Sequence, residues 1–186
     1  VVGTTSGALL GQAQVGGADA FIQKYDGEGN AAWTRQFGTT ASDTATAVAA
    51  GPTGIYVMGY TSGALPGQAQ VGGFDAFIRK YDGEGNEAWT RQFGTVGTDV
   101  GWGIAVDDSG VYATGTTTGT FLGEGNAGGQ DGFVRRVDFE GNEMWTREFG
   151  TAGSDTPRAT SVDATPGFGG VYVVGYTTGI FPGFAN

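Results

Sequence analysis

The chain contains no cysteine and no histidine. Without cysteine there can be no disulfide and no thiol chemistry, and without histidine the commonest general base and metal ligand is missing. Basic residues are also scarce, since nine Lys and Arg face nineteen Asp and Glu, for a net charge of −10. This charge disfavours nucleic acid and anionic membranes as partners. No apolar run approaches the ~18 residues of a membrane-spanning helix, so we expect no membrane insertion.

Glycine and aromatic residues are what the chain has in abundance. Glycine accounts for 38 of the 186 residues, and there are 12 Phe, 7 Tyr and 4 Trp. The glycines do not recur at every third position, which excludes a collagen-like chain, and the aromatic content is too high for a disordered linker. The composition predicts short strands, many tight turns and aromatic packing.

The sequence repeats itself with a period of 56 residues. Trp33, Trp89 and Trp145 recur at this interval, and residues 1–39 and 57–95 differ at six of their 39 aligned positions. The differing pairs are Val2/Met58, Thr4/Tyr60, Leu10/Pro66, Ala18/Phe74, Gln23/Arg79 and Ala31/Glu87. We divide the chain, as one domain, into units 1–56, 57–112 and 113–172 and a partial unit 173–186.

Each unit carries four strand patterns and no helical periodicity. In one unit they cover residues 103–107, 111–116, 132–137 and 143–149, and turns such as 82–86 contain the Gly and Asn residues that tolerate positive φ. Four short antiparallel strands in about fifty residues are typical of one β-propeller blade. The predicted fold is therefore all-β, with the small, apolar 103–107 strand lining a central channel.

The repeated pattern resembles a known family. It runs Gly-Gly-x-Asp-(Ala/Gly)-Phe-(Ile/Val), Asp-x-x-Gly-Asn-x-x-Trp, Phe-Gly-Thr-x-x-(Ser/Thr)-Asp and (Ile/Val)-Tyr-x-x-Gly-x-Thr. This combination is similar to the SBBP repeat, a bacterial β-propeller repeat, over essentially the whole chain. The resemblance implies a propeller in a secreted or cell-surface protein. It implies no defined activity and therefore no catalytic residues.

Counting strands predicts an incomplete ring. Residues 1–39 supply three strands without the innermost one, two full blades follow, and residues 155–177 supply two more strands. About thirteen strands make three and a quarter blades, whereas propellers close with ~4–8. We expect a fragment of a longer propeller; the alternative is several copies that associate through open blade edges. Two copies would give about 26 strands, which is not a multiple of four.

Two sets of repeated aspartates are candidate sites. Asp19, Asp75 and Asp131 follow Gly-Gly, and we expect their side chains to accept backbone N–H groups of the preceding turn. Asp43, Asp99 and Asp155 precede the channel strand and are the candidate metal ligands, since carboxylates gathered at a channel mouth would attract Ca²⁺. Turn capping is the favoured role for this second set, and the metal site is its alternative.

Positions that vary within a repeated frame are candidates for ligand contact. One such position holds Thr46, Trp102 and Arg158 in successive copies, and these are the predicted ligand-binding residues. The recurrent tryptophans at 33, 89 and 145 could stack on sugars, but their regular spacing favours packing between blades.

The residues indicate a protein without catalytic function. No nucleophile–base pair can be assembled without His or Cys, although two-carboxylate glycoside hydrolysis stays open because acids are plentiful. We expect a structural or interaction propeller of a secreted or cell-surface bacterial protein, with a protein partner or self-association. The alternative function is a lectin-like propeller that binds carbohydrate or another small ligand at sites repeated in each blade.

Overall fold

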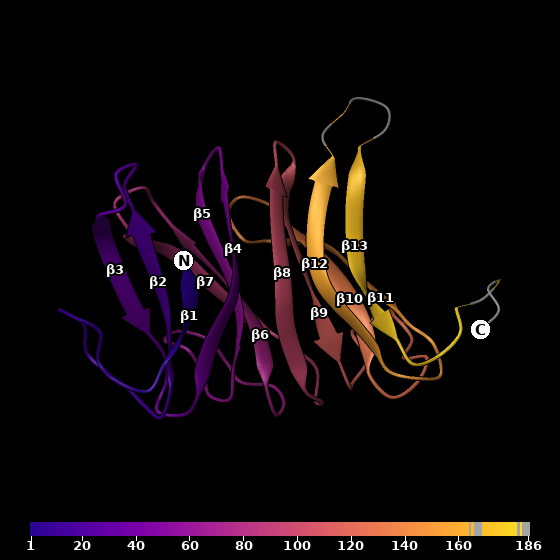
Figure 1. Ribbon diagram of the computed structural model, residues 1–186. Helices are drawn as coiled ribbons and strands as arrows, with labels where there is room; N and C mark the ends of the chain where they lie inside the picture. The colour runs from indigo at the N-terminus through magenta and orange to yellow at the C-terminus, as the bar shows by residue number, and fades with distance from the viewer. Residues whose placement is uncertain (164, 166–168, 182, 184–186) are drawn as a thin grey trace.

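The computed structural model is built from β-strands alone (Figure 1). It describes residues 1–163, 165, 169–181 and 183. Thirteen strands form four antiparallel sheets, and this part of the chain contains no helix. The all-β prediction is thus confirmed, and the strand count agrees with the sequence. With no helix in the described ranges, none is available to cross a membrane.

The four sheets are named I to IV in chain order. Sheet I contains β1 (Val2–Thr5), β2 (Asp19–Tyr25) and β3 (Ala31–Phe37). Sheet II contains β4 (Asp43–Gly51), β5 (Gly54–Thr61), β6 (Asp75–Tyr81) and β7 (Glu87–Phe93). Sheet III contains β8 (Asp99–Asp107), β9 (Gly110–Thr117), β10 (Asp131–Val137) and β11 (Glu143–Phe149). Sheet IV contains β12 (Asp155–Asp163) and β13 (Gly170–Thr177).

Sheets II and III define four strand positions, and the other two sheets fill only some of them. The first position is held by β4, β8 and β12, and the second by β1, β5, β9 and β13. In the described residues, sheet I has no strand at the first position and sheet IV none at the third or fourth. The sheets also cross the unit boundaries set by the 56-residue period, because sheet II covers 43–93 and sheet III covers 99–149.

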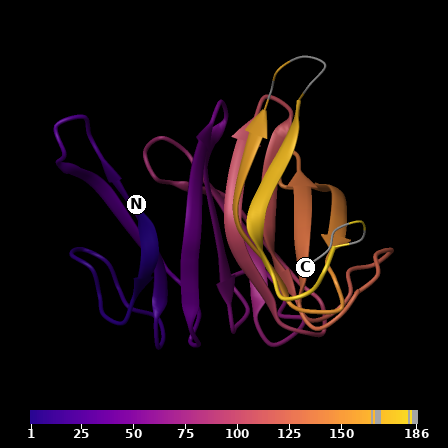
Figure 2. The same cartoon turned by 45° about the vertical axis from the view of Figure 1, so that its right-hand side comes forward.

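The sheets stand side by side, and their first strands are neighbours. In Figures 1 and 2, β4, β8 and β12 follow one another across the same side of the molecule, and these strands contact each other. The apolar core lies between the sheets. Tyr56, Met58, Phe93 and Phe133 belong to the cluster between sheets II and III, and a second cluster joins sheets I and II. Side-chain packing therefore connects sheet I to sheet II and sheet II to sheet III.

A glycine on each second strand leaves room for a phenylalanine of the third strand. Gly59 lies opposite Phe77 and Gly115 lies opposite Phe133 in the antiparallel register. A Cβ at Gly115 would lie 2.6 Å from Cζ of Phe133 and would also overlap the carbonyl oxygen of Val100. The ring of the third strand therefore covers the glycine, where a larger residue would not fit.

Adjacent sheets are also joined by a polar contact that we call the Trp–turn joint. The indole Nε1 of Trp33 on β3 donates to the carbonyl oxygen of Gly83 at 3.0 Å. Arg35 donates from Nε to the carbonyl oxygen of Gly85 at 2.7 Å and from Nη2 to that of Glu84 at 3.0 Å. These three acceptors lie in the β6–β7 turn of the next sheet. The expectation that Trp33 packs between repeats is confirmed.

The joint recurs between sheets II and III. Trp89 Nε1 donates to the carbonyl oxygen of Phe139 at 3.0 Å, and Arg91 Nε donates to that of Gly141 at 3.1 Å. Gly141 has φ +82°, a left-handed conformation that favours glycine, and a Cβ there would meet the Trp89 ring at 3.1 Å. Asp138 fixes the conformation of this turn, because its Oδ1 accepts the N–H groups of Glu140 at 3.0 Å and Asn142 at 2.7 Å.

Candidate ligand surface

The three predicted ligand residues occupy equivalent irregularities of the first strands. The pairing register shifts between Ala45 and Ala47, between Gly101 and Gly103, and between Pro157 and Ala159. The residue inside each shift is Thr46, Trp102 or Arg158. Such a bulge leaves one residue outside the regular ladder and redirects its side chain. The sequence position that varies among the repeats is thus a backbone bulge.

Trp102 and Arg158 lie in contact, whereas the Thr46 hydroxyl donates hydrogen bonds to backbone carbonyl groups. The guanidinium carbon of Arg158 lies 4.8 Å from the centre of the Trp102 ring, a cation–π distance. The Thr46 hydroxyl donates to the carbonyl oxygens of Gly101 at 2.9 Å and Met58 at 3.2 Å. Thr46 therefore ties sheet II to sheet III and supports the strand that carries Trp102.

Other aromatic side chains extend this pair into a row across three sheets. Tyr60 lies 6.2 Å from Trp102 between ring centres, and Phe74 packs edge-on against Tyr60 at 5.3 Å. On the other side, the Arg158 guanidinium lies 5.4 Å from the Tyr176 ring. We call these five residues the aromatic row. Trp102, Tyr60 and Phe74 are partly exposed and Arg158 is exposed, so the row offers aromatic surface and one cation to solvent.

The cation also changes the acidity of one member of the row. Hydrogen bonding with Thr156 and Arg158, together with the Arg158 charge, lowers the pKa of the Tyr176 hydroxyl. Arg158 Nη2 lies 3.3 Å from the Tyr176 oxygen. The row can therefore offer aromatic stacking beside a cationic hydrogen-bond donor, which suits a sugar ring or an anionic aromatic group.

Tyr60 and Phe74 were not among the predicted ligand residues, although both positions vary between the first two repeats. They are two of the six positions at which residues 57–95 depart from residues 1–39, where Thr4 and Ala18 stand instead. A systematic comparison of the repeats would have placed them beside Trp102 as variable residues.

The predicted carboxylate ring of Asp43, Asp99 and Asp155 is not formed. Each aspartate begins a first strand and is turned back onto the threonine four residues earlier, as when Asp99 Oδ2 accepts the Thr95 N–H at 2.7 Å. Burial, with the nearby Asp75 charge, raises the pKa of Asp99 despite hydrogen bonds from Thr95 and Thr117. Among the described residues, no group of three or more His, Cys, Asp or Glu is placed to hold a metal ion.

The aspartates that follow Gly-Gly lie buried beside this second set. Asp75 accepts the N–H groups of Val71 at 2.8 Å and Gly72 at 3.1 Å. Asp19 and Asp131 occupy the same place in sheets I and III, where Asp19 accepts the N–H of Val15 and Asp131 that of Ala127. These carboxylates accept N–H groups of the turn before the third strand, as expected, although Asp131 Oδ1 has no hydrogen-bond partner in the described part of the chain.

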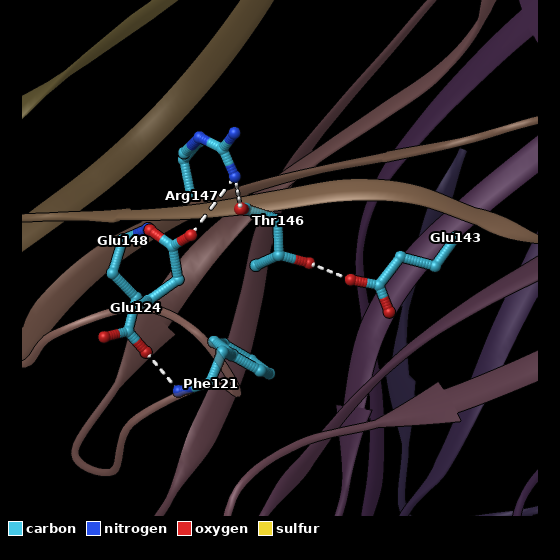
Figure 3. Close-up of polar contacts among 6 residues, drawn as sticks. All are labelled: Phe121, Glu124, Glu143, Thr146, Arg147 and Glu148. Atoms are coloured by element: carbon cyan, nitrogen blue, oxygen red, sulfur yellow. Dashed lines mark hydrogen bonds and ion pairs between the residues drawn. The ribbon is translucent and has the colours of Figure 1, made fainter.

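The third repeat has glutamates at two positions where the earlier repeats have glutamines, Glu124 and Glu148 (Figure 3). The corresponding Gln92 donates from Nε2 to Asp75, but Glu148 has no N–H to offer Asp131. Glu148 Oε1 accepts the Phe121 N–H at 2.6 Å, just as Gln92 Oε1 accepts the Leu65 N–H at 2.9 Å, so the bonds that are lost are those donated by the side-chain amide. Burial, together with the Asp131 charge, raises the pKa of the Glu148 carboxyl. Asp131 Oδ1 and Glu148 Oε2 are buried without a hydrogen-bond partner among the described residues, and these residues form no group of three or more side chains placed to hold a metal ion there.

Comparison with known proteins gives a partial relative. No family model matches the chain. Regulatory protein FlaEY of Caulobacter vibrioides is similar, with 35% identity over 99 residues. The aligned region covers 49% of this chain and 10% of the relative, so the chain spans only about a tenth of that protein's length.

Proposed function

We propose that the chain is a non-catalytic structural and interaction module made of β-propeller blades, in which sheets II and III are complete blades. The observation that carries the proposal is the Trp–turn joint, which connects sheet I to II and sheet II to III through the same donors and acceptors. A joint that repeats without change suits a scaffold that extends or closes by adding equal units.

Further features support a role in assembly within a secreted or cell-surface bacterial protein of the SBBP type. Sheets I and IV lack strand positions in the described residues, and open strand edges favour pairing with another chain. The acidic side chains that recur in the repeats are used in turns, as Asp75 and Asp99 illustrate. The 10% coverage of the FlaEY protein, described as regulatory, suits a module of a larger protein.

The module should self-associate when it is isolated as the 186-residue chain. Sedimentation velocity over about a hundredfold range of concentration should show a mass that rises from the 18.9 kDa monomer, because mass action favours pairing of open edges. Added salt should strengthen association, since it screens the repulsion between copies of charge −10. A folded chain that stays monomeric at every concentration and salt level would contradict the interaction role.

The aromatic row supports a second candidate function, binding of a carbohydrate. Replacement Trp102→Ala removes the central ring of the row, and we expect it to weaken glycan binding about tenfold or more, as loss of a stacking anchor does. Glycan-array screening of the wild type, then titration of the strongest hit, measures the effect. Val96→Ala is the control, because Val96 is 88% exposed and lies outside the row. Absence of any glycan signal, or equal binding by the Trp102 variant, would count against this function.

A further inference from the structure

The outer edge of β13 is open, although its sequence is close to that of strands paired on both sides: it differs from β5 only at Val171 and Val174, where β5 has Ile55 and Met58. Among the described residues β13 pairs with β12 alone, whereas the equivalent β5 and β9 each pair on both sides. Sheet IV also has no following sheet to cover its face among the described residues, and there Tyr172 is 59% exposed and Val174 is 64% exposed. The equivalent Tyr56 and Met58 are fully buried. The edge therefore has the sequence of an interior strand without its partner.

A cavity marks the place that a third strand would fill. It measures about 330 Å³, and its lining includes Gly175, Pro157 and Phe149. Gly175 is the equivalent of Gly59 and Gly115, which lie beneath Phe77 and Phe133. In sheets I and II, Phe37 and Phe93 of the fourth strand contact the phenylalanine of the next sheet edge-on, at 5.7 and 5.9 Å. Phe149 is the corresponding residue here, so the cavity is lined by the equivalents of residues that surround a phenylalanine in sheets II and III.

The outer side of sheet III carries half of a Trp–turn joint. Trp145 and Arg147 are the equivalents of Trp89 and Arg91, but no described residue supplies a turn for them. Arg147 keeps the bond from Nη1 to the Thr146 carbonyl and pairs with Glu124 at 3.1 Å (Figure 3). Its Nε and Nη2, which in Arg91 reach the next sheet, have no acceptor among the described residues.

Sheet I carries the other half of the joint. The β2–β3 turn, residues 26–30, has the sequence and hydrogen bonds of the 82–86 turn. A Cβ at Gly85 would meet the Trp33 ring at 2.8 Å, whereas nothing lies within 4 Å of a Cβ at Gly29. The turn is complete but has no tryptophan against it in the described structure.

The strand that would fill the cavity is part of the same hairpin. β2 carries Phe21 and is only partly covered by β1, which pairs with residues 19–22. The equivalent β6 is paired by β5 along its full length, residues 75–81. Tyr25 at the uncovered end is 47% exposed, while its equivalent Tyr81 is 2% exposed. β13 has eight residues and occupies the same strand position as β1, so it can pair with all of β2.

We propose that the β2–β3 hairpin of a second copy of this chain completes sheet IV. This inference rests on the proposed assembly function and names the partner and the surface. In the complex, β13 replaces β1 on β2 of the second copy, and Phe21 of that copy enters the cavity over Gly175. Its 26–30 turn then seats against Trp145 and Arg147. One docking event thus fills the strand edge, the cavity and the open joint.

The exchange also explains how 26 strands in two copies can form complete four-stranded sheets. Each copy contributes sheet II, sheet III and one composite sheet of β12, β13 and the second copy's β2 and β3. Reciprocal exchange between two copies gives six four-stranded sheets, and only the two β1 strands are left over. Six blades lie within the ~4–8 of closed propellers. The interface joins two different surfaces, yet a two-copy ring closes it and leaves no free end.

Engineered cysteines test the register directly, because the chain has none of its own. The equivalent pair Val57–Arg79 is opposed in sheet II, which predicts that Val173 opposes Gln23 of the second copy. Opposed residues in antiparallel strands have the Cα separation that a disulfide needs. We mix the variants Val173→Cys and Gln23→Cys under mild oxidation. We expect the 173–23 disulfide about a hundredfold faster than from free collision at ~10 μM, since docked strands have millimolar effective concentration.

Controls separate this exchange from other associations. A mixture of Val173→Cys with Val96→Cys, whose residue 96 is remote and exposed, should cross-link only at the collision rate. Rapid 173–173 linkage by Val173→Cys alone would show β13 pairing with β13, which overturns the exchange but leaves self-association intact. A chain that carries both Val173→Cys and Gln23→Cys provides a further control. If it forms an internal disulfide and stays a monomer, β13 pairs with β2 of its own chain, and the proposed exchange is overturned. No association at all would defeat both the exchange and the assembly function.

A second variant leaves the strands untouched. Arg147 is largely exposed, so Arg147→Ala should fold normally, as circular dichroism would show. We expect its dimer dissociation constant to rise about tenfold, because the joint loses charge-assisted hydrogen bonds. A dissociation constant equal to that of the wild type would exclude the 26–30 turn as the partner of Trp145 and Arg147.

Discussion

Replacement of Trp89 by alanine is expected to lower the free energy of unfolding by about 3 kcal/mol. The indole fills the space above Gly141, donates to the Phe139 carbonyl at 3.0 Å and packs on Tyr56 with ring centres 6.0 Å apart. The alanine variant loses the packing of this half-buried ring and leaves that carbonyl without its donor. Urea unfolding followed by circular dichroism measures the loss.

Trp145→Ala is the matched control for this prediction. Trp145 has the same place on its strand and packs on Tyr112 with ring centres 6.3 Å apart, but no turn of a neighbouring sheet contacts it among the described residues. Its replacement should cost about 1 kcal/mol when both variants are measured at concentrations that keep the chain monomeric. Equal losses from the two variants would mean that the joint between sheets adds nothing to stability.

The sequence predicted the strands well because their determinants are local. The residues that make the β10–β11 hairpin, its Asp-x-x-Gly-Asn turn and its alternating strands, lie within about twenty positions. The expected fourth strand, 143–149, agrees with β11, and the third, 132–137, is one residue shorter than β10. The first strand was expected from 103 but begins at Asp99, because the bulge at Trp102 interrupts its alternation.

Contacts between sheets were harder to predict, since they join residues about fifty positions apart. Repetition indicated that Trp33 packs against a neighbour, but not that its partner is the carbonyl oxygen of Gly83. Repetition also suggested a ring of carboxylates. The structure shows the favoured role instead, turn capping, because the Asp99 carboxylate accepts the N–H of Thr95 in the turn before its strand.

The aromatic row is a further case in which the sequence indicated the residues but not the contact between them. Trp102 and Arg158 were found because the position varies, but their contact depends on two bulges in neighbouring sheets. The variation marked which residues to compare, and the backbone irregularity decided that they meet. In a nearly perfect repeat, the positions that differ between copies are therefore the first candidates for a site that only one copy provides.

Gly115→Ala is expected to destabilise the chain by about 3 kcal/mol, at the upper end of the range for overpacking. A Cβ would overlap the Val100 carbonyl oxygen, which is backbone, and would lie 2.6 Å from Cζ of Phe133. The ring has no room to retreat, because Phe93 and Phe121 hold it edge-on at 5.9 and 5.3 Å. In a thermal melt the midpoint should fall by on the order of 9 °C for a chain of this size.

Gly3→Ala separates this packing effect from the general cost of replacing glycine in a strand. Gly3 has the same position on β1, but the nearest atoms to its Cβ belong to the Phe21 ring alone, the closest at 2.9 Å. No first strand lies beside β1 in the described structure, so no backbone oxygen blocks the methyl group and Phe21 can shift. We expect a loss below about 1 kcal/mol, partly offset by the reduced entropy of the unfolded chain. If both variants lost the same amount, the crowding imposed by the first strand would not be what requires glycine at this position.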